Sequence, residues 1–383
     1  MDATLPGPVA LLHQLVSLPS VSSTSPGLDM GNRPVIDLLA GYLETLGFDI
    51  EIQALDEQGH KANLLASRGT GPGGLVLAGH TDTVPYDDGR WSVDPLALTE
   101  RDNRLYGLGS TDMKGFFPLA IEAARAFSDV ELGAPLIILA TADEESSMNG
   151  ARALAAAGKP RARQAIIGEP TGLRPVRLHK GIMMEAVKIR GQAGHSSDPS
   201  LGNNALDGLH AVLGELMRYR QELTQRHRHP QFSVPHPTLN LGCAHGGDNP
   251  NRICGSAELH FDMRVTPGFS NSEARAELRE RLAGVAGESG LEISMESLIA
   301  GADSFEQAAD CELVQLAEQL TGHSSEAVAF ATEAPYLQQL GMDTIVLGPG
   351  SINRAHQPDE YIELDQFQPC IDLLQRFIAH FCQ

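Results

Sequence analysis

The chain has 383 residues, of which 49 are acidic and 28 are basic, so its formal charge is −21 with neutral histidines. Hydrophobic residues make up 42% and charged residues 20%, which is the composition of a globular protein. The negative charge argues against nucleic acid and anionic membranes as partners, because both bind basic surfaces. The length predicts two or three domains.

The expected cellular location rests on the apolar runs, the first residues and the cysteines of the sequence. No apolar run approaches the ~18 residues that span a bilayer, and residues 1–15 contain no Lys or Arg of the kind that opens a secretory signal. The cysteines form no Cys-x-x-Cys pair and are odd in number, which argues against a disulfide framework. We therefore expect a cytoplasmic protein with five free cysteines at positions 243, 254, 311, 370 and 382.

The first part of the chain alternates short apolar runs with helical patterns. In chain order we expect a strand at 75–78, a helix at 113–127, a strand at 136–139, a helix at 151–157 and a strand at 165–167. After the middle of the chain the same alternation returns, with a strand at 344–347 and a helix at 370–381. This pattern is typical of an α/β domain with a mostly parallel sheet.

The middle segment has a different pattern. We expect a strand at 185–190, a helix at 205–225, strands at 238–243 and 257–265, a helix opened by the capping box at 270–273, and a strand near 292–297. This βαββαβ order predicts a ferredoxin-like domain. We assign residues 180–292 to this inserted domain and residues 1–179 and 293–383 to a split α/β domain. Residues 180–292 carry a formal charge of −1, so −20 lies outside them.

Side chains that can bind metals follow the predicted parallel strands. Ligands of open α/β sheets bind beyond the carboxyl ends of the strands, and four of the predicted strands are followed there by such side chains. A further one, Asp112, lies between a glycine-rich turn and the start of the next helix. One acid after a strand is most often a helix cap, and the pair Glu144–Glu145 suits the first turn of a helix equally well. Several independent strand ends are harder to explain in this way. The set comprises His80, Asp112, Glu145, Glu169 and His356.

The chemistry of these five side chains favours two metal ions. Imidazoles and carboxylates without thiolates suit Zn²⁺, Co²⁺ or Mn²⁺. Five ligands exceed the need of one metal, and a bridging Asp112 would give each of two metals three protein ligands around an activated water. Asp82, two residues after His80, is expected to orient that imidazole, and Glu144 is expected to act as general base.

Six ordered motifs resemble the dinuclear-zinc aminoacylase and carboxypeptidase family of metallopeptidases. They are Gly79–Val84, Gly109–Gly115, Ala142–Glu145, Gly168–Thr171, Gly194–Ser197 and Ala355–Tyr361. The resemblance covers essentially the whole chain. It implies two Zn²⁺ per subunit, replaceable by Co²⁺, and the residue roles given above. It also implies a homodimer in which the inserted domain serves dimerisation and acts as a lid, with His195 of a second copy helping to hold the oxyanion.

The resemblance further implies an acylated amino acid as substrate, specifically the hydrolysis of N2-acetyl-L-ornithine to L-ornithine and acetate in arginine biosynthesis. Asn251 and Arg264, with Arg252 as a further candidate, are expected to meet the substrate carboxylate, and Gly350 is expected to line the pocket. Many relatives have Gly-Gly-Thr-Asp where this chain has Ala331–Ala334. We expect Glu333 to face the ornithine ammonium; a metal-supporting or helix-capping role is the alternative.

Two other functions stay open. A related deacylase, acting on succinyl-diaminopimelate or acetylcitrulline or as a general aminoacylase, would share every metal motif and differ only in the pocket. A non-catalytic binding protein on the same scaffold is less consistent with the sequence, because such a site has no chemical need for Glu144.

Overall fold

The computed structural model of the chain describes residues 5–383, which form two compact units. The first unit comprises the chain up to Arg177 with residues 307–326 and 332–383; the second comprises residues 178–306 and 327–331. The expected second boundary, at 292/293, would cut β12 (Glu292–Ser297) after its first residue, although this strand pairs with the sheet of the second unit. The chain therefore returns to the first unit later, at residue 307.

The first unit is built around a mixed sheet whose central strands are parallel. Strands β3, β6, β7 and β15 run in the same direction and are buried on both faces, which explains their continuous apolar runs. Antiparallel strands flank this centre. In spatial order the strands are β1 (Asp49–Ala54), β2 (Ala62–Arg68), β6 (Leu136–Thr141), β3 (Leu75–His80), β7 (Gln164–Pro170), β15 (Asp343–Gly348) and β8 (Val176–His179).

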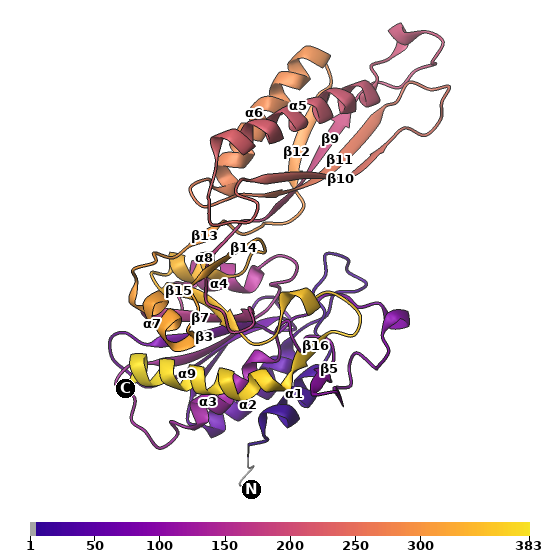
Figure 1. The fold of residues 1–383 in the computed structure, drawn as a ribbon. Coiled ribbons are helices and arrows are strands. Elements are labelled where there is room, and N and C mark those ends of the chain that lie inside the picture. The colour runs from indigo at the N-terminus through magenta and orange to yellow at the C-terminus, as the bar shows by residue number, and fades with distance from the viewer. Residues whose placement is uncertain (1–4) are drawn as a thin grey trace. The chain divides into compact units, whose positions relative to one another are not determined.

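Helices cover both faces of this sheet (Figure 1). Five helices share one hydrophobic cluster with one face of the sheet: α1 (Pro8–Val16), α2 (Arg33–Thr45), α3 (Phe116–Arg125), α7 (Glu312–Thr321) and α9 (Phe367–Cys382). Helices α4 (Asn149–Ala157) and α8 (Ala334–Gln339) pack together on the other face. The predicted helix at 113–127 begins only at Phe116, because residues 113–115 form turns.

A three-stranded sheet connects two distant segments of the first unit. Its order is β16 (Tyr361–Glu363), β5 (Arg104–Tyr106) and β4 (Thr99–Arg101), all antiparallel. Tyr361 pairs with Tyr106, and their rings lie 5.2 Å apart. This pairing brings the chain that follows His356 alongside the chain that leads to Asp112.

The second unit is a four-stranded antiparallel sheet with two helices. Its spatial order is β10 (Thr238–Gly246), β11 (Ser256–Arg264), β9 (Met183–Arg190) and β12, while α5 (Ala205–Arg226) and α6 (Asn271–Ser289) share one hydrophobic core with the sheet. The predicted capping box of α6 is present, with reciprocal bonds between Ser270 and Glu273. The expected ferredoxin-like arrangement is confirmed (Figure 1).

Two further strands are short. β13 (Phe305–Glu306) and β14 (Glu326–Val328) both pair with β8.

Over residues 5–383, no helix combines the length and the apolar character needed to cross a bilayer.

Candidate metal centre

The four parallel strands bring their carboxyl ends to one edge of the sheet, and the expected metal-binding side chains stand there. His80 is the last residue of β3, and Glu169 is the next-to-last residue of β7. Glu144 and Glu145 follow the end of β6, while His356 follows β15 after a single 3₁₀ turn. Asp112 arrives from a separate segment, the turn between β5 and α3.

Asp112 stands between the two histidines and turns a different oxygen to each. His80 Nε2 lies 3.1 Å from Asp112 Oδ1 and 3.7 Å from Glu169 Oε1. His356 Nε2 lies 3.2 Å from Asp112 Oδ2 and 3.0 Å from Glu145 Oε1. The five side chains thus converge as two groups with a carboxylate in common.

Glu144 belongs to the same cluster. Ligand atoms of His80, Glu144 and Glu169 lie within 4.8 Å of one another, as do those of His80, Asp112 and Glu145. Burial raises the pKa of Glu144 well above its usual value, and the charges of Glu169 and Glu145 reinforce this shift. A proton is therefore held more firmly here than on an exposed carboxylate.

The ring orientation of His80 shows that the cluster fits a metal ion. Its Nδ1 lies 3.0 Å from the backbone carbonyl oxygen of Asp82, which accepts only if Nδ1 carries the hydrogen. In the neutral imidazole, the lone pair of Nε2 then faces the carboxylates of Asp112 and Glu169. A proton or a metal ion must separate these groups, and a carbonyl that fixes the far nitrogen is the usual support of a metal-binding histidine.

The charges of the cluster also indicate that it fits metal ions. Burial raises the pKa of Glu145 and Glu169 above their usual values, with Asp112 adding to both shifts. Hydrogen bonds with Asp112 and Glu145 raise the pKa of His356 to about 11. Burial opposes ionisation of Asp112, but bonds with His356 and His80 still hold its pKa below the usual range. Buried carboxylates crowded in this way require positive charge, which divalent cations supply.

Asp82 supports the cluster differently from our expectation. Its carboxylate oxygen Oδ1 is 3.7 Å from His80 Nδ1, which is too far for a hydrogen bond, and the backbone carbonyl accepts that hydrogen instead. Asp82 Oδ2 accepts the backbone N–H of Glu145 at 3.1 Å. The carboxylate therefore fixes the loop after β6 rather than the imidazole.

Glu333 lies beside the cluster, directly before α8. Its side chain is buried, and Oε2 accepts a hydrogen bond from Thr141 Oγ1 at 2.9 Å. Burial raises its pKa to about 7. It makes no side-chain capping bond to α8, and Oε1 is buried without a partner among the described residues. The helix-capping alternative is thus not supported.

The structure places Gly350 in a tight internal turn. Its φ is +85°, and a Cβ there would lie 2.5 Å from Thr111 Oγ1, so the position requires glycine. Its N–H donates to Gln366 Oε1 at 2.6 Å, and its carbonyl accepts the N–H of Gly172. The N–H is therefore already used within the protein.

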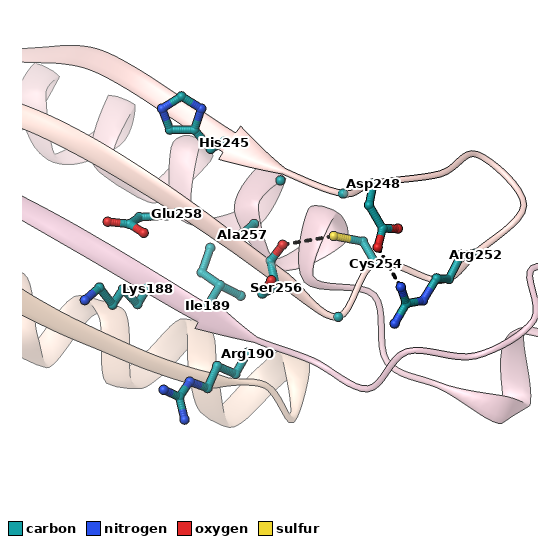
Figure 2. A pocket seen from close by; sticks show the side chains of 13 residues that line it. Lys188, Ile189, Arg190, His245, Asp248, Arg252, Cys254, Ser256, Ala257 and Glu258 are labelled. Carbon is teal, nitrogen blue, oxygen red and sulfur yellow. Dashed lines mark hydrogen bonds and ion pairs between the residues drawn. The ribbon is translucent and has the colours of Figure 1, made fainter.

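The remaining predicted site residues belong to the second unit. His195 is exposed and its Nδ1 lies 2.7 Å from Ser197 Oγ; Asn251 is also exposed. Arg264 pairs with Asp262 at 3.0 Å. Arg252 pairs with Asp248 at 2.6 Å on the wall of a cavity of about 360 Å³ (Figure 2). Their roles toward a substrate stay predictions.

One buried residue that sequence reasoning did not single out holds Asp112 in place. Glu360 accepts the backbone N–H groups of Thr111 and Asp112 at 2.8 and 3.0 Å on one oxygen, and that of Gly109 at 3.1 Å on the other. It lies within the motif that contains His356, four residues further on, and this is the only sequence signal that we find for it.

The chain belongs to peptidase family M20/M25/M40, whose sequence pattern matches residues 76–380. This confirms the predicted class, a hydrolase with a metallopeptidase-like fold.

Individual relatives agree with the family assignment. Acetylornithine deacetylase of Klebsiella pneumoniae (strain 342) is 48% identical, and that of Edwardsiella ictaluri (strain 93-146) is 49% identical, each over 100% of both chains. Among solved structures, a metallo-carboxypeptidase of the M20 family from Sulfolobus solfataricus aligns with a TM-score of 0.75 at 17% identity, covering 98% of this chain and 99% of the other. Human carnosine dipeptidase 1 aligns with a TM-score of 0.69 at 18% identity over 97% and 95% of the two chains. These likenesses confirm the fold.

Proposed function

We propose that the chain is a metal-dependent amidohydrolase that hydrolyses N2-acetyl-L-ornithine to L-ornithine and acetate, in arginine biosynthesis. One observation carries the choice of substrate: the acetylornithine deacetylases named above match at 48% and 49% identity along their entire length. The cluster at the strand ends supports the type of reaction, because it provides metal ligands together with an additional carboxylate, Glu144.

We assign the metal ligands from the two groups that share Asp112. His80 and Glu169 would hold one ion, Glu145 and His356 the other, and Asp112 would bridge them with its two oxygens. The donor set suits two Zn²⁺ per subunit, with Co²⁺ as a substitute. When bound, such ions polarise an acyl carbonyl and lower the pKa of water.

Glu144 is the proposed general base. Hydrolysis of the amide needs a group that takes a proton from the attacking water and gives it to the departing amine nitrogen. Glu144 is near both His80 and Glu169 and appears in neither ion's proposed ligand set, so its carboxylate is available for this transfer. Positive charge nearby would lower its raised pKa toward the range in which it can accept and release a proton.

Substrate selection is proposed for residues of both units. Asn251 and Arg264, with Arg252 as a further candidate, would bind the substrate carboxylate, and Glu333 would attract the side-chain ammonium of ornithine. The buried and unpartnered Oε1 of Glu333 supports this last role. His195 would be supplied by a second copy of the chain and would help hold the oxyanion, which makes the proposed enzyme a homodimer. We further propose a cytoplasmic location.

A substrate panel tests the proposed function. Metal-stripped and zinc-restored protein would be assayed with acetylornithine, acetylcitrulline, acetylmethionine and succinyl-diaminopimelate. We expect hydrolysis only after zinc is restored, with the highest kcat/KM for acetylornithine. A higher value for another substrate would identify a related deacylase. Failure to hydrolyse any of them with metal loaded would favour a binding protein.

A further inference from the structure

The loop that presents Glu144 and Glu145 begins at a residue with an unusual backbone conformation. Asp143, two residues after the end of β6, has a φ of +61°, in the left-handed region that a non-glycine residue seldom adopts. Such a conformation persists only where the surrounding structure determines it. Because Asp143 directly precedes the two glutamates, the groups that hold it also set the direction in which they point.

Two side chains hold the carboxylate of Asp143, and one of them also contacts Ser146. Lys61 Nζ lies 2.6 Å from Oδ1, and Ser22 Oγ donates to the same oxygen at 2.9 Å. Ser22 Oγ also lies 2.5 Å from Ser146 Oγ, which is on the far side of the glutamate pair. The Asp143 side chain is only 6% exposed, so its bonds are shielded from solvent. The loop is therefore held both before and after Glu144 and Glu145.

Lys61 is itself fixed in place. It stands directly before β2, and its Nζ also lies 2.8 Å from Asp29, whose Oδ1 accepts the backbone N–H of Ser23. Its side chain is 19% exposed, which makes this ion pair much less solvated than a surface salt bridge. A charged, partly buried bond of this kind can hold a loop against the repulsion of neighbouring carboxylates.

We infer that Lys61 is a positioning residue for the proposed reaction: through Asp143 it aims Glu144 and Glu145 at the metal centre. The inference rests on the proposed function for its catalytic consequence. It does not require Lys61 to touch the substrate or a metal. Loss of a supporting group around a metal site typically lowers activity or metal affinity about 10-fold to 100-fold.

A cavity next to Lys61 allows a direct test by chemical rescue. It measures about 390 Å³, and its lining includes Lys61, Asp143, Asp29, His60 and Asn149. Shortening Lys61 to alanine would extend this cavity toward the Asp143 carboxylate. A primary alkylammonium ion could then enter and donate the missing hydrogen bonds.

The experiment compares Lys61→Ala, Lys61→Arg and a control, Lys159→Ala, in the full-length protein. Lys159 is the control because it makes an ion pair with Glu51 at 2.8 Å in which both side chains are about half exposed. The kcat and KM for acetylornithine are measured with and without propylammonium or tetramethylammonium. The visible absorption of the cobalt-loaded proteins provides a readout that does not depend on turnover.

For Lys61→Ala we expect kcat to fall about 10-fold to 100-fold with KM changed little, and the cobalt spectrum to shift. Propylammonium should restore both, tetramethylammonium should restore neither because it has no N–H, and Lys61→Arg should stay close to the unmodified protein. An unchanged kcat and spectrum in Lys61→Ala would overturn the inference. It would also be overturned if a lower melting temperature accounted for the loss of kcat and the spectral shift, and propylammonium restored neither. Inactivity of the unmodified protein would instead count against the proposed function, and the spectra would still decide the role of Lys61.

Discussion

His80 directs Nε2 at Asp112 Oδ1 across 3.1 Å while its Nδ1 is held by the backbone carbonyl of Asp82. The imidazole cannot turn away without breaking that second bond. Its lone pair is thus kept toward the carboxylates, in the orientation that a metal ion needs. The hydrogen bond from His80 Nδ1 to the backbone of Asp82 therefore holds the imidazole in the orientation that cation binding needs.

Removal of metal should therefore abolish hydrolysis reversibly. Treatment with a chelator leaves the buried carboxylates Asp112, Glu145 and Glu169 without compensating charge, and we expect both activity and thermal stability to fall. Zinc or cobalt should restore both. Activity and calorimetric melting, measured together with metal content, provide the check. Full activity in protein that contains neither metal would contradict the proposed chemistry.

Replacing Glu144 by Gln should remove proton transfer and leave the ligands intact. We expect kcat to fall about 10²-fold to 10⁴-fold while the metal content per chain is unchanged. Glu312→Gln is a matched control, because Glu312 is exposed on α7, where its carboxylate pairs with His380 at 2.9 Å. Retained turnover in Glu144→Gln would exclude Glu144 as the general base.

Glu360→Gln tests whether the hydrogen bonds from backbone N–H groups to Glu360 hold Asp112 in place. The amide would turn its NH₂ group toward backbone N–H donors that are now paired with a carboxylate, leaving buried groups unsatisfied at about 1–3 kcal/mol. We expect a lower free energy of unfolding and weaker metal binding, measured by denaturation and by competition with a chelator. Glu363→Gln, a partly exposed change in β16, serves as the control and should alter neither.

His179, the last residue of β8, predicts a pH dependence of stability. The imidazole is buried 5.3 Å from the ring of Phe305, and burial lowers its pKa to about 4. Between pH ~6.5 and ~4 the unfolded chain binds a proton that the folded chain does not, so stability should fall with falling pH, by up to about 3 kcal/mol. NMR titration of the imidazole measures this pKa directly. An ordinary value near 6.5 would remove the effect, and His179→Gln should flatten the stability profile over this range.

Glu333→Gln separates the two roles that the structure leaves to this residue. If Glu333 attracts the ornithine ammonium, KM for acetylornithine should rise and the preference over neutral acylamino acids should shrink. If it only supports the metal ligands, kcat should fall equally for charged and neutral substrates. Steady-state kinetics with acetylornithine and acetylmethionine decide between them, and an unchanged KM with unchanged preference would contradict substrate recognition.

The fold class of each unit was predictable from the sequence, because hydrophobic periodicity can be read from short segments. The four parallel strands of the first unit appear as short apolar runs. The βαββαβ order of the second unit appears as local alternation of apolar and polar residues. Four of the metal-binding candidates were predictable for a related reason, since His80, Glu145, Glu169 and His356 come soon after such runs. Asp112 lies in a separate turn before α3. Contacts between distant segments were not. Glu360 meets Asp112 across 248 positions, and Lys61 meets Asp143 across 82, and no local pattern indicates either pairing.

The split of the first unit has a consequence for how the centre is assembled during synthesis. His356 and Glu360 follow the whole of residues 178–306 in the chain, whereas His80, Asp112, Glu145 and Glu169 precede that segment. Because a chain emerges from the ribosome N-terminus first, the second unit can fold while the candidate metal centre still lacks His356 and the carboxylate of Glu360 that holds Asp112. The nascent chain thus presents an incomplete acidic cluster, and His356 can join the proposed ligand set only after the segment beyond residue 307 has been made.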